Sequence, residues 1–256
     1  MKNEYIFVDT GEQDVAVITI DRPPVNALNS VAYAELYNAF YNLGLDDSVK
    51  VVVITGAGEK AFVAGADVRE FLNFNSENGA LYTRNNQYIR EFIRKYNKPV
   101  ICAVNGWAFG GGLALALMCD IRFACPEAKF NLGEINMGIL GATQYIAGVT
   151  HSGMARLLVY GETINAEEAL RAGIIDKIVP RDELLTESVA LAKRIASKPP
   201  LALKYAKQCM IKSEEVLLEE GLVFEEAVLK VLWGSEDKNE AVSAFLEKRK
   251  PVFKNK

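Results

Sequence analysis

The sequence predicts an α/β fold on three observations. Short β-branched runs alternate with helical patterns along residues 1–180, and half of the 256 residues are hydrophobic, which is enough to build a sizeable core. From residue 182 onward the pattern becomes wholly helical. We therefore expect an α/β body over residues 1–180 and a helical C-terminal region over residues 181–256.

Four β-branched runs that end in turn residues predict strands buried on both faces. They occupy residues 15–20, 50–55, 98–104 and 174–179. Helical periodicity fills two of the intervals, from an N-cap at Ser30 to about Leu43 and over residues 81–96. Strands that are joined by helical crossovers in this way are typical of α/β folds.

The C-terminal region shows four helical segments, at residues 182–196, 199–210, 213–232 and 238–248. No strand signal returns there. A helical tail of this kind either packs on its own body or serves as an assembly surface, and the pattern alone leaves both alternatives open.

Charge and composition exclude several classes of function. Lys and Arg total 29 against 33 for Asp and Glu, so a net charge of -4 gives no basic footprint for nucleic acid. The chain has one histidine, His151, which excludes sites built from several imidazoles around zinc or iron. We expect no metal and no nucleic-acid partner.

The four cysteines predict a reducing compartment, because none has the C-x-x-C spacing of a metal or redox motif. The first eight residues lack the continuous apolar stretch of a signal peptide, and no run of 18 apolar residues occurs. We expect a soluble cytoplasmic protein without a membrane partner.

The densest candidate site is the stretch 105–120, in which a strand end is followed by Gly110, Gly111 and Gly112 and then by an apolar helix. The first N–H groups of a helix lack intrahelical partners, so they can hold a phosphate or a developing oxyanion. The structural alternative is close packing of the helix on the sheet. Neither G-x-G-x-x-G nor a Walker spacing is present, so the sequence does not indicate a nucleotide cofactor.

Two further stretches carry candidate residues. Residues 61–68 place small side chains beside Asp67, which indicates either a close backbone approach or a turn into a helix capped by Asp67. Glu134 is a lone carboxylate among glycines and apolar residues. In an apolar wall its pKa would be raised and it could move protons at neutral pH, whereas in a solvated loop it would have no such role.

Eight stretches, taken together and in this order, resemble the crotonase superfamily, the enoyl-CoA hydratase and isomerase family. They are D-R-P-P-V-N-A-L-N at 21–29, I-T-G-A-G at 54–58, F-V-A-G-A-D at 62–67, K-P-V-I at 98–101, N-G-W-A-F-G-G-G at 105–112, C-D-I-R at 119–122, A-L-R-A-G-I at 169–174 and A-F-L-E-K-R at 244–249. They span nearly the whole chain.

The resemblance implies a crotonase-like spiral of ββα units whose C-terminal helices support a homotrimer or homohexamer. It also implies an acyl-coenzyme A thioester as substrate, with no cofactor beyond the coenzyme A that the substrate carries. The backbone N–H groups of Ala64 and Gly111 would hold the thioester oxygen as it becomes an enolate. The resemblance places the following residues along the coenzyme A and acyl chain: Val25, Ala27, Ala64, Gly65, Ala66, Asp67, Gly110 and Gly111, with Phe245 and Lys248 reaching from a neighbouring subunit.

The chain departs from the family's hydratases at one catalytic position. Those enzymes commonly hold a water between two glutamates; Glu134 matches one of them, but Ala114 replaces the other. The loop at 137–144 is also shorter and lacks a proline. We therefore expect a Δ3,Δ2-enoyl-CoA isomerase-like enzyme in which Glu134 shuttles a proton. The alternatives are a hydratase in which another group, such as Tyr145, holds the water, and a non-catalytic crotonase-fold binding protein.

Overall fold

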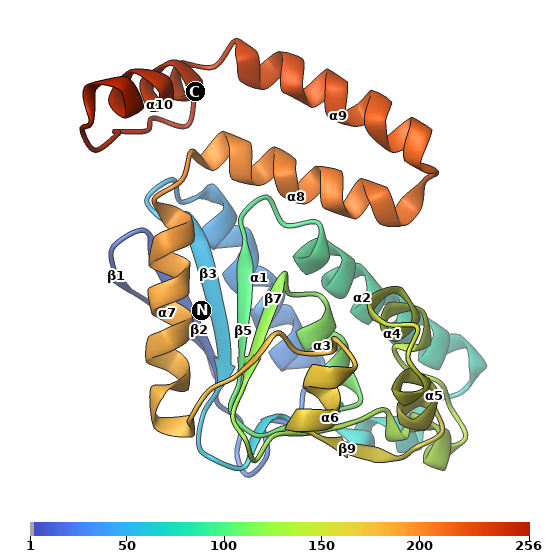
Figure 1. The fold of residues 1–256 in the computed structure, drawn as a ribbon. Coiled ribbons are helices and arrows are strands. Elements are labelled where there is room, and N and C mark those ends of the chain that lie inside the picture. The colour runs from blue at the N-terminus through green and yellow to red at the C-terminus, as the bar shows by residue number, and fades with distance from the viewer. Residues whose placement is uncertain (1–2) are drawn as a thin grey trace.

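A computed structural model describes residues 3–256, which form two sheets and their covering helices (Figure 1). In the larger sheet β1 pairs antiparallel with β2 and all other neighbours are parallel. Its strands, in sheet order, are β1 (Ile6–Glu12), β2 (Val15–Ile20), β3 (Val51–Gly56), β5 (Val100–Val104), β7 (Ile121–Ala124) and β10 (Lys177–Ile178).

The smaller sheet has three parallel strands and an antiparallel edge strand, β9. Its members, in sheet order, are β4 (Ala61–Val63), β6 (Trp107–Phe109), β8 (Lys129–Asn131) and β9 (Thr163–Asn165). Three times in succession the chain runs from a strand of the larger sheet into one of the smaller sheet, as β3–β4, β5–β6 and β7–β8. This repeat confirms the expected α/β spiral.

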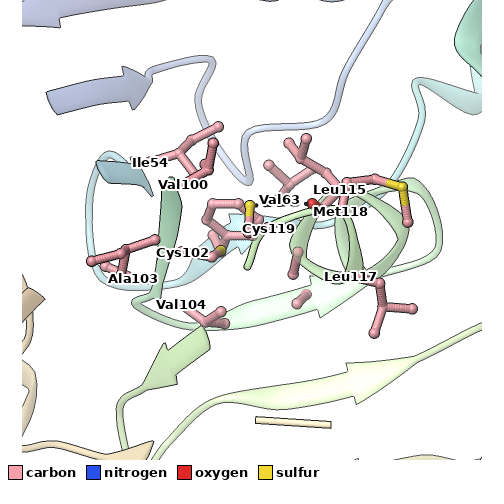
Figure 2. Packing of buried hydrophobic residues seen from close by; sticks show 14 of the residues in the cluster. Ile54, Val63, Val100, Cys102, Ala103, Val104, Leu115, Leu117, Met118 and Cys119 are labelled. Atoms are coloured by element: carbon pink, nitrogen blue, oxygen red, sulfur yellow. Dashed lines mark hydrogen bonds between the residues drawn. The ribbon is translucent and has the colours of Figure 1, made fainter. Parts of the chain in front are cut away.

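Helices follow these strand pairs or cover the sheets. In the body they are α1 (Ser30–Leu45), α2 (Ser76–Arg94), α3 (Gly111–Leu117), α4 (Thr143–Val149), α5 (Gly153–Val159) and α6 (Ala166–Arg171), with 3-10 turns η1 (Val68–Asn73) and η2 (Gly133–Met137). Figure 2 shows Leu115 of α3 beside Val63 of β4, and Val100 of β5 beside Ile54 of β3; all four belong to one core, which continues between the two sheets.

The C-terminal region is helical as predicted, with α7 (Arg181–Ala196), α8 (Pro200–Glu215), α9 (Leu218–Trp233) and α10 (Glu236–Glu247). Helix α7 packs on β3 and β5 of the larger sheet, whereas α9 lies beside α8 and leads to α10 at the edge of the molecule (Figure 1). The division at residues 180 and 181 stays a prediction. Among residues 3–256, no helix is both long and apolar enough to cross a bilayer.

Several element boundaries differ from those predicted. Asn29, and not Ser30, is the N-cap of α1, because its side-chain oxygen accepts a hydrogen bond from the Ala32 N–H at 2.9 Å. Of the strand expected at 174–179, only β10 (Lys177–Ile178) forms a strand that pairs in the sheet. The residues just before it instead close the turn that follows α6. Helix α2 starts at Ser76, five residues earlier than expected, behind a capping box at Asn75.

Candidate active site

The three candidate motifs all follow strands of the smaller sheet. The small-residue stretch follows β4, the glycine run follows β6, and Glu134 follows β8. Because these strands are parallel neighbours, their carboxyl ends meet at one edge of the sheet. Stretches about 70 residues apart in the sequence are thereby brought into one site.

The glycine run places the start of α3 tightly against β4. Gly110 has φ of +49°, a conformation that favours glycine, and its N–H donates to the Asn131 carbonyl at 2.8 Å. A Cβ on Gly112 would overlap the Val63 carbonyl, so no larger residue fits there. Gly111 begins the helix, and its N–H has no acceptor among residues 3–256. The same turn therefore provides both the close packing of α3 on the sheet and a free N–H for the candidate site.

The structure corrects the expected oxyanion donor at Ala64. The Ala64 N–H donates to the Val25 carbonyl at 3.0 Å, so it is not free to hold a thioester oxygen. Two residues on, the Ala66 N–H has no acceptor in the described part of the chain, and its nitrogen would lie 3.6 Å from a Cβ on Gly111. The error arose because the sequence does not show which N–H of the stretch is used in pairing.

The remaining residues of this stretch support the backbone. Gly65 and Leu28 link the loop after β2 to the stretch, because the Leu28 N–H donates to the Gly65 carbonyl at 2.8 Å. The Asp67 carboxylate caps η1 and pairs with Arg22 and Arg69, and the Arg69 guanidinium is the main reason that its pKa lies well below the usual range. A contact between Asp67 and coenzyme A stays a prediction.

The Glu134 carboxylate lies against two glycines. Its Oε1 would be 2.9 Å from a Cβ on Gly110, and a Cβ on Gly141 would overlap the same oxygen. Oε2 is shielded from solvent and has no hydrogen-bond partner among residues 3–256. Burial raises the pKa of Glu134, although Arg90 opposes the shift. Glu134 is therefore not the solvated loop residue of the structural alternative; it is a partly buried carboxylate with a free oxygen.

Ala114 is buried in α3, one helical turn after Gly111. Its N–H donates to the Gly110 carbonyl at 2.9 Å, and its methyl group belongs to the packed interior. Tyr145, the residue considered as a substitute for the absent glutamate, is half-buried on α4 and packs against the hydrophobic core. Its suggested role in holding water stays a prediction.

Two polar side chains that the motifs did not reveal adjoin this site. Arg90 of α2 donates from Nη2 to the Tyr33 hydroxyl of α1 at 3.2 Å. A Cβ on Gly111 would lie 2.9 Å from the Tyr33 oxygen and 3.5 Å from Arg90 Nη2. The sequence did carry one signal for Arg90. It lies four residues after Asn86 and three before Ile93, which are both buried, so helical spacing puts its cation on the inner face of α2.

The residues expected to reach coenzyme A from α10 lie apart from this site within one chain. Phe245 is 83% exposed and Lys248 ends α10 in the left-handed conformation. Figure 1 shows α10 at the opposite end of the molecule from β9 of the smaller sheet. Their proposed role in a neighbouring subunit stays a prediction. Residues 3–256 hold no group of three or more His, Cys, Asp or Glu side chains that could bind a metal ion.

Comparison with known proteins identifies the family. Residues 10–256 match the family model described as enoyl-CoA hydratase/isomerase. The chain is 38% identical over 251 residues to the short-chain-enoyl-CoA hydratase of Clostridium acetobutylicum, covering 96% of each chain. It is also 38% identical over 250 residues to the 2,3-dehydroadipyl-CoA hydratase of Escherichia coli, covering 96% of this chain and 97% of the relative.

Solved structures agree with this assignment. The crystal structure of an enoyl-CoA hydratase from Bacillus anthracis matches with a TM-score of 0.94 and 34% identity, over 99% of this chain and all of that one. The likeness in sequence and in fold extends over nearly the whole chain, and the family is one of enzymes. The chain therefore belongs to the enoyl-CoA hydratase/isomerase family of the crotonase superfamily.

Proposed function

We propose that this enzyme adds water to the double bond of a 2-enoyl-CoA thioester, with Glu134 as the single acid and base. The observation that carries the proposal is the Glu134 carboxylate, partly buried against Gly110 with one oxygen unpaired, beside the free N–H of Gly111. The names of its relatives, which are hydratases, support water addition over the isomerase chemistry that Ala114 suggested.

The chemistry follows from two features of the site. The N–H groups of Ala66 and Gly111 would donate to the thioester oxygen and stabilise the negative charge that develops on it. Glu134 would take a proton from water as the water oxygen bonds to C3, and the electron pair of the double bond would move toward the thioester. The protonated Glu134 would then return the proton to C2, which regenerates the carboxylate and balances the reaction.

Isomerisation is the second candidate, and Ala114 is the observation that favours it. A methyl group at this position leaves Glu134 without a second carboxylate to hold the water. The same glutamate beside the same N–H pair would suffice to remove a proton from C2 of a 3-enoyl-CoA and return it at C4. No cofactor is needed for either reaction, because the acyl-CoA supplies every reacting carbon.

A pair of assays separates the two reactions. Purified protein is given crotonyl-CoA and, separately, 3-hexenoyl-CoA, and mass spectrometry of the products detects added water. The proposal expects hydration of crotonyl-CoA. Conversion of 3-hexenoyl-CoA to the 2-enoyl isomer without hydration of crotonyl-CoA would establish the isomerase instead, and absence of turnover with every enoyl-CoA, neutral or carboxylated, would refute both.

The C-terminal helices support a proposal of self-assembly into a homotrimer or homohexamer. Large apolar side chains are exposed along α9 and α10, including Leu218, Val223, Trp233, Phe245 and Leu246, each more than two-thirds exposed. So many exposed large apolar side chains on two neighbouring helices support a role of these helices in a protein interface. Equilibrium sedimentation tests the assembly, and a monomer at micromolar concentration would contradict it.

A further inference from the structure

Arg90 is a shielded cation that forms no ion pair with any carboxylate within residues 3–256. Its Nε is inaccessible to solvent and has no hydrogen-bond partner in the described part of the chain, where its one side-chain hydrogen bond goes to the Tyr33 hydroxyl. Three other arginines with mostly covered side chains, Arg22, Arg94 and Arg122, each lie within 4 Å of an Asp or Glu carboxylate oxygen.

A guanidinium that is shielded from water lowers the stability of the fold unless an anion lies beside it. Removing a charge from water without a partner is strongly unfavourable, and arginine does not lose its proton to relieve the cost. Glu134 is near enough for Arg90 to influence its pKa, but the two side chains form no ion pair. Within residues 3–256, Glu134 therefore acts on Arg90 only at a distance, and no carboxylate pairs with it directly.

The position of Arg90 indicates where the missing anion belongs. Arg90 Nη2 would lie 3.5 Å from a Cβ on Gly111, and the Ala66 nitrogen would lie 3.6 Å from the same point. These distances put the guanidinium beside the N–H pair proposed to hold the thioester oxygen. An acyl group bound there would extend within reach of Arg90 and of the Tyr33 hydroxyl.

Other unpaired polar atoms lie on the same elements. The shielded side-chain atoms without a partner in the described chain are the Tyr82 hydroxyl and Arg90 Nε on α2, Glu134 Oε2 on η2, and the Thr143 hydroxyl at the start of α4. Three of these atoms, on Tyr82, Arg90 and Thr143, are donors, and a plain hydrocarbon tail would leave the Arg90 donor unsatisfied, whereas a polar acyl group would give it an acceptor.

We propose that the acyl group of the substrate carries a carboxylate, which Arg90 and Tyr33 bind. The substrate class is therefore a carboxylated 2-enoyl-CoA, and Arg90 is the residue that selects it over a neutral chain. The inference rests on the proposed action on an acyl-CoA thioester. The planar guanidinium suits this task, because it can donate two parallel hydrogen bonds to a carboxylate.

Binding of unreactive analogues tests the proposal independently of turnover. Glutaryl-CoA and pentanoyl-CoA have five acyl carbons each and differ only in a terminal carboxylate against a methyl group. Calorimetry should show glutaryl-CoA binding about 10- to 100-fold more tightly, and the substitution Arg90→Leu should abolish this preference. The comparison is repeated with the six-carbon pair, adipyl-CoA and hexanoyl-CoA, in which the carboxylate lies one carbon further from the thioester.

The control is Arg84→Leu, which makes the same change in net charge on the same helix at an exposed position. It should leave the preference for the carboxylated ligand intact. Tyr33→Phe removes only the hydroxyl and should reduce the preference several-fold, so it tests the inference even if Arg90→Leu fails to fold.

Two outcomes would overturn the inference. They are equal binding of the two ligands at both chain lengths, and an intact preference in Arg90→Leu, which includes an equal loss of affinity for the carboxylated and the neutral ligand. Absence of turnover with every enoyl-CoA would refute the proposed reaction but would leave these binding ratios valid.

Discussion

Replacement of Glu134 by glutamine tests the proposed proton transfer most directly. Glutamine keeps the size and planarity of the side chain between Gly110 and Gly141, so the packing of η2 should be preserved. It removes the basic oxygen, and the Ala66 and Gly111 N–H groups remain in place. We expect binding of the acyl-CoA to persist while turnover is lost.

The expected magnitude follows from the composition of the site. Loss of a general acid or base typically costs roughly 10² to 10⁴ in rate, which corresponds to about 3 to 5 kcal/mol. Because Ala114 stands where family hydratases commonly have a second glutamate, the proposed mechanism assigns both proton transfers to Glu134. The loss in kcat should therefore lie at the upper end, at about 10⁴-fold.

The pH dependence provides an independent check. Burial raises the pKa of Glu134 above 4.5, its ordinary value, and only the ionised carboxylate can accept a proton from water. The kcat/KM of the wild-type enzyme should therefore fall as the pH drops through this raised pKa. Removal of the opposing cation by Arg90→Leu should move the acid limb to still higher pH, because Arg90 stabilises the ionised form.

The assay is hydration of crotonyl-CoA, measured as the loss of absorbance of the conjugated enoyl thioester, with Glu167→Gln on the exposed face of α6 as the matched control. Affinity for a saturated acyl-CoA and thermal unfolding are measured alongside. If Glu134→Gln retained more than about a tenth of the wild-type kcat, the base would be another group and the reasoning would be refuted.

Three further predictions concern the scaffold. Gly112→Ala should destabilise the fold by about 3 kcal/mol or more, because its Cβ would overlap the Val63 carbonyl. Gly148→Ala has open space around its Cβ and should stabilise α4 by about 0.5 to 1 kcal/mol. Urea denaturation measures both changes in the free energy of unfolding. Asp67→Asn should cost about 2 kcal/mol at neutral pH through its arginine pairs. Since the pKa of Asp67 is lowered on folding, its contribution is present above the ordinary aspartate range and is lost as the pH falls below it, so variant and wild-type stabilities should converge in acid. Val223→Asp should weaken the proposed assembly, measured by sedimentation at several concentrations; an unchanged mass would show that this part of α9 lies outside the interface.

The long elements were predictable because each carries a pattern long enough to recognise. The run of β2 is β-branched and buried almost throughout, and the helices from α7 onward repeat apolar positions over three or more turns. Strands β4, β6 and β8 have three residues each, too few for any period to show. Since these short strands align the active-site motifs, the motifs themselves were better guides to the site than the predicted secondary structure was.

Two errors at the site have a common physical cause. Whether Ala64 or Ala66 offers a free N–H depends on which of them the Val25 carbonyl occupies, a long-range pairing that no local pattern encodes. Arg90 and Tyr33 likewise look like ordinary members of two amphipathic helices, and only the crossing of α1 and α2 brings them to Gly111. Residues held by backbone motifs were therefore predictable from the sequence, whereas those supplied by helix packing were not.

Ala114 and Arg90 together make the proposed acyl site less negative than a site with two glutamates and no cation. This difference leads to a last prediction. A site with two carboxylates and no cation would repel an anionic acyl group, whereas one carboxylate with an unpaired guanidinium would attract it. Ala114 lies one turn beyond Gly111 on α3, so in Ala114→Glu the new carboxylate would be placed to pair with Arg90.

That variant should lose the preference for glutaryl-CoA over pentanoyl-CoA by about 10-fold or more, because the protein would then supply its own counter-ion. If Glu134 can share a water with the new carboxylate, hydration of crotonyl-CoA should rise at the same time. Thermal unfolding must accompany both measurements, because the site at Ala114 is fully buried. A variant that folds and still prefers glutaryl-CoA would show that the acyl carboxylate and position 114 do not compete for Arg90, and the proposed electrostatic role of Arg90 would be wrong.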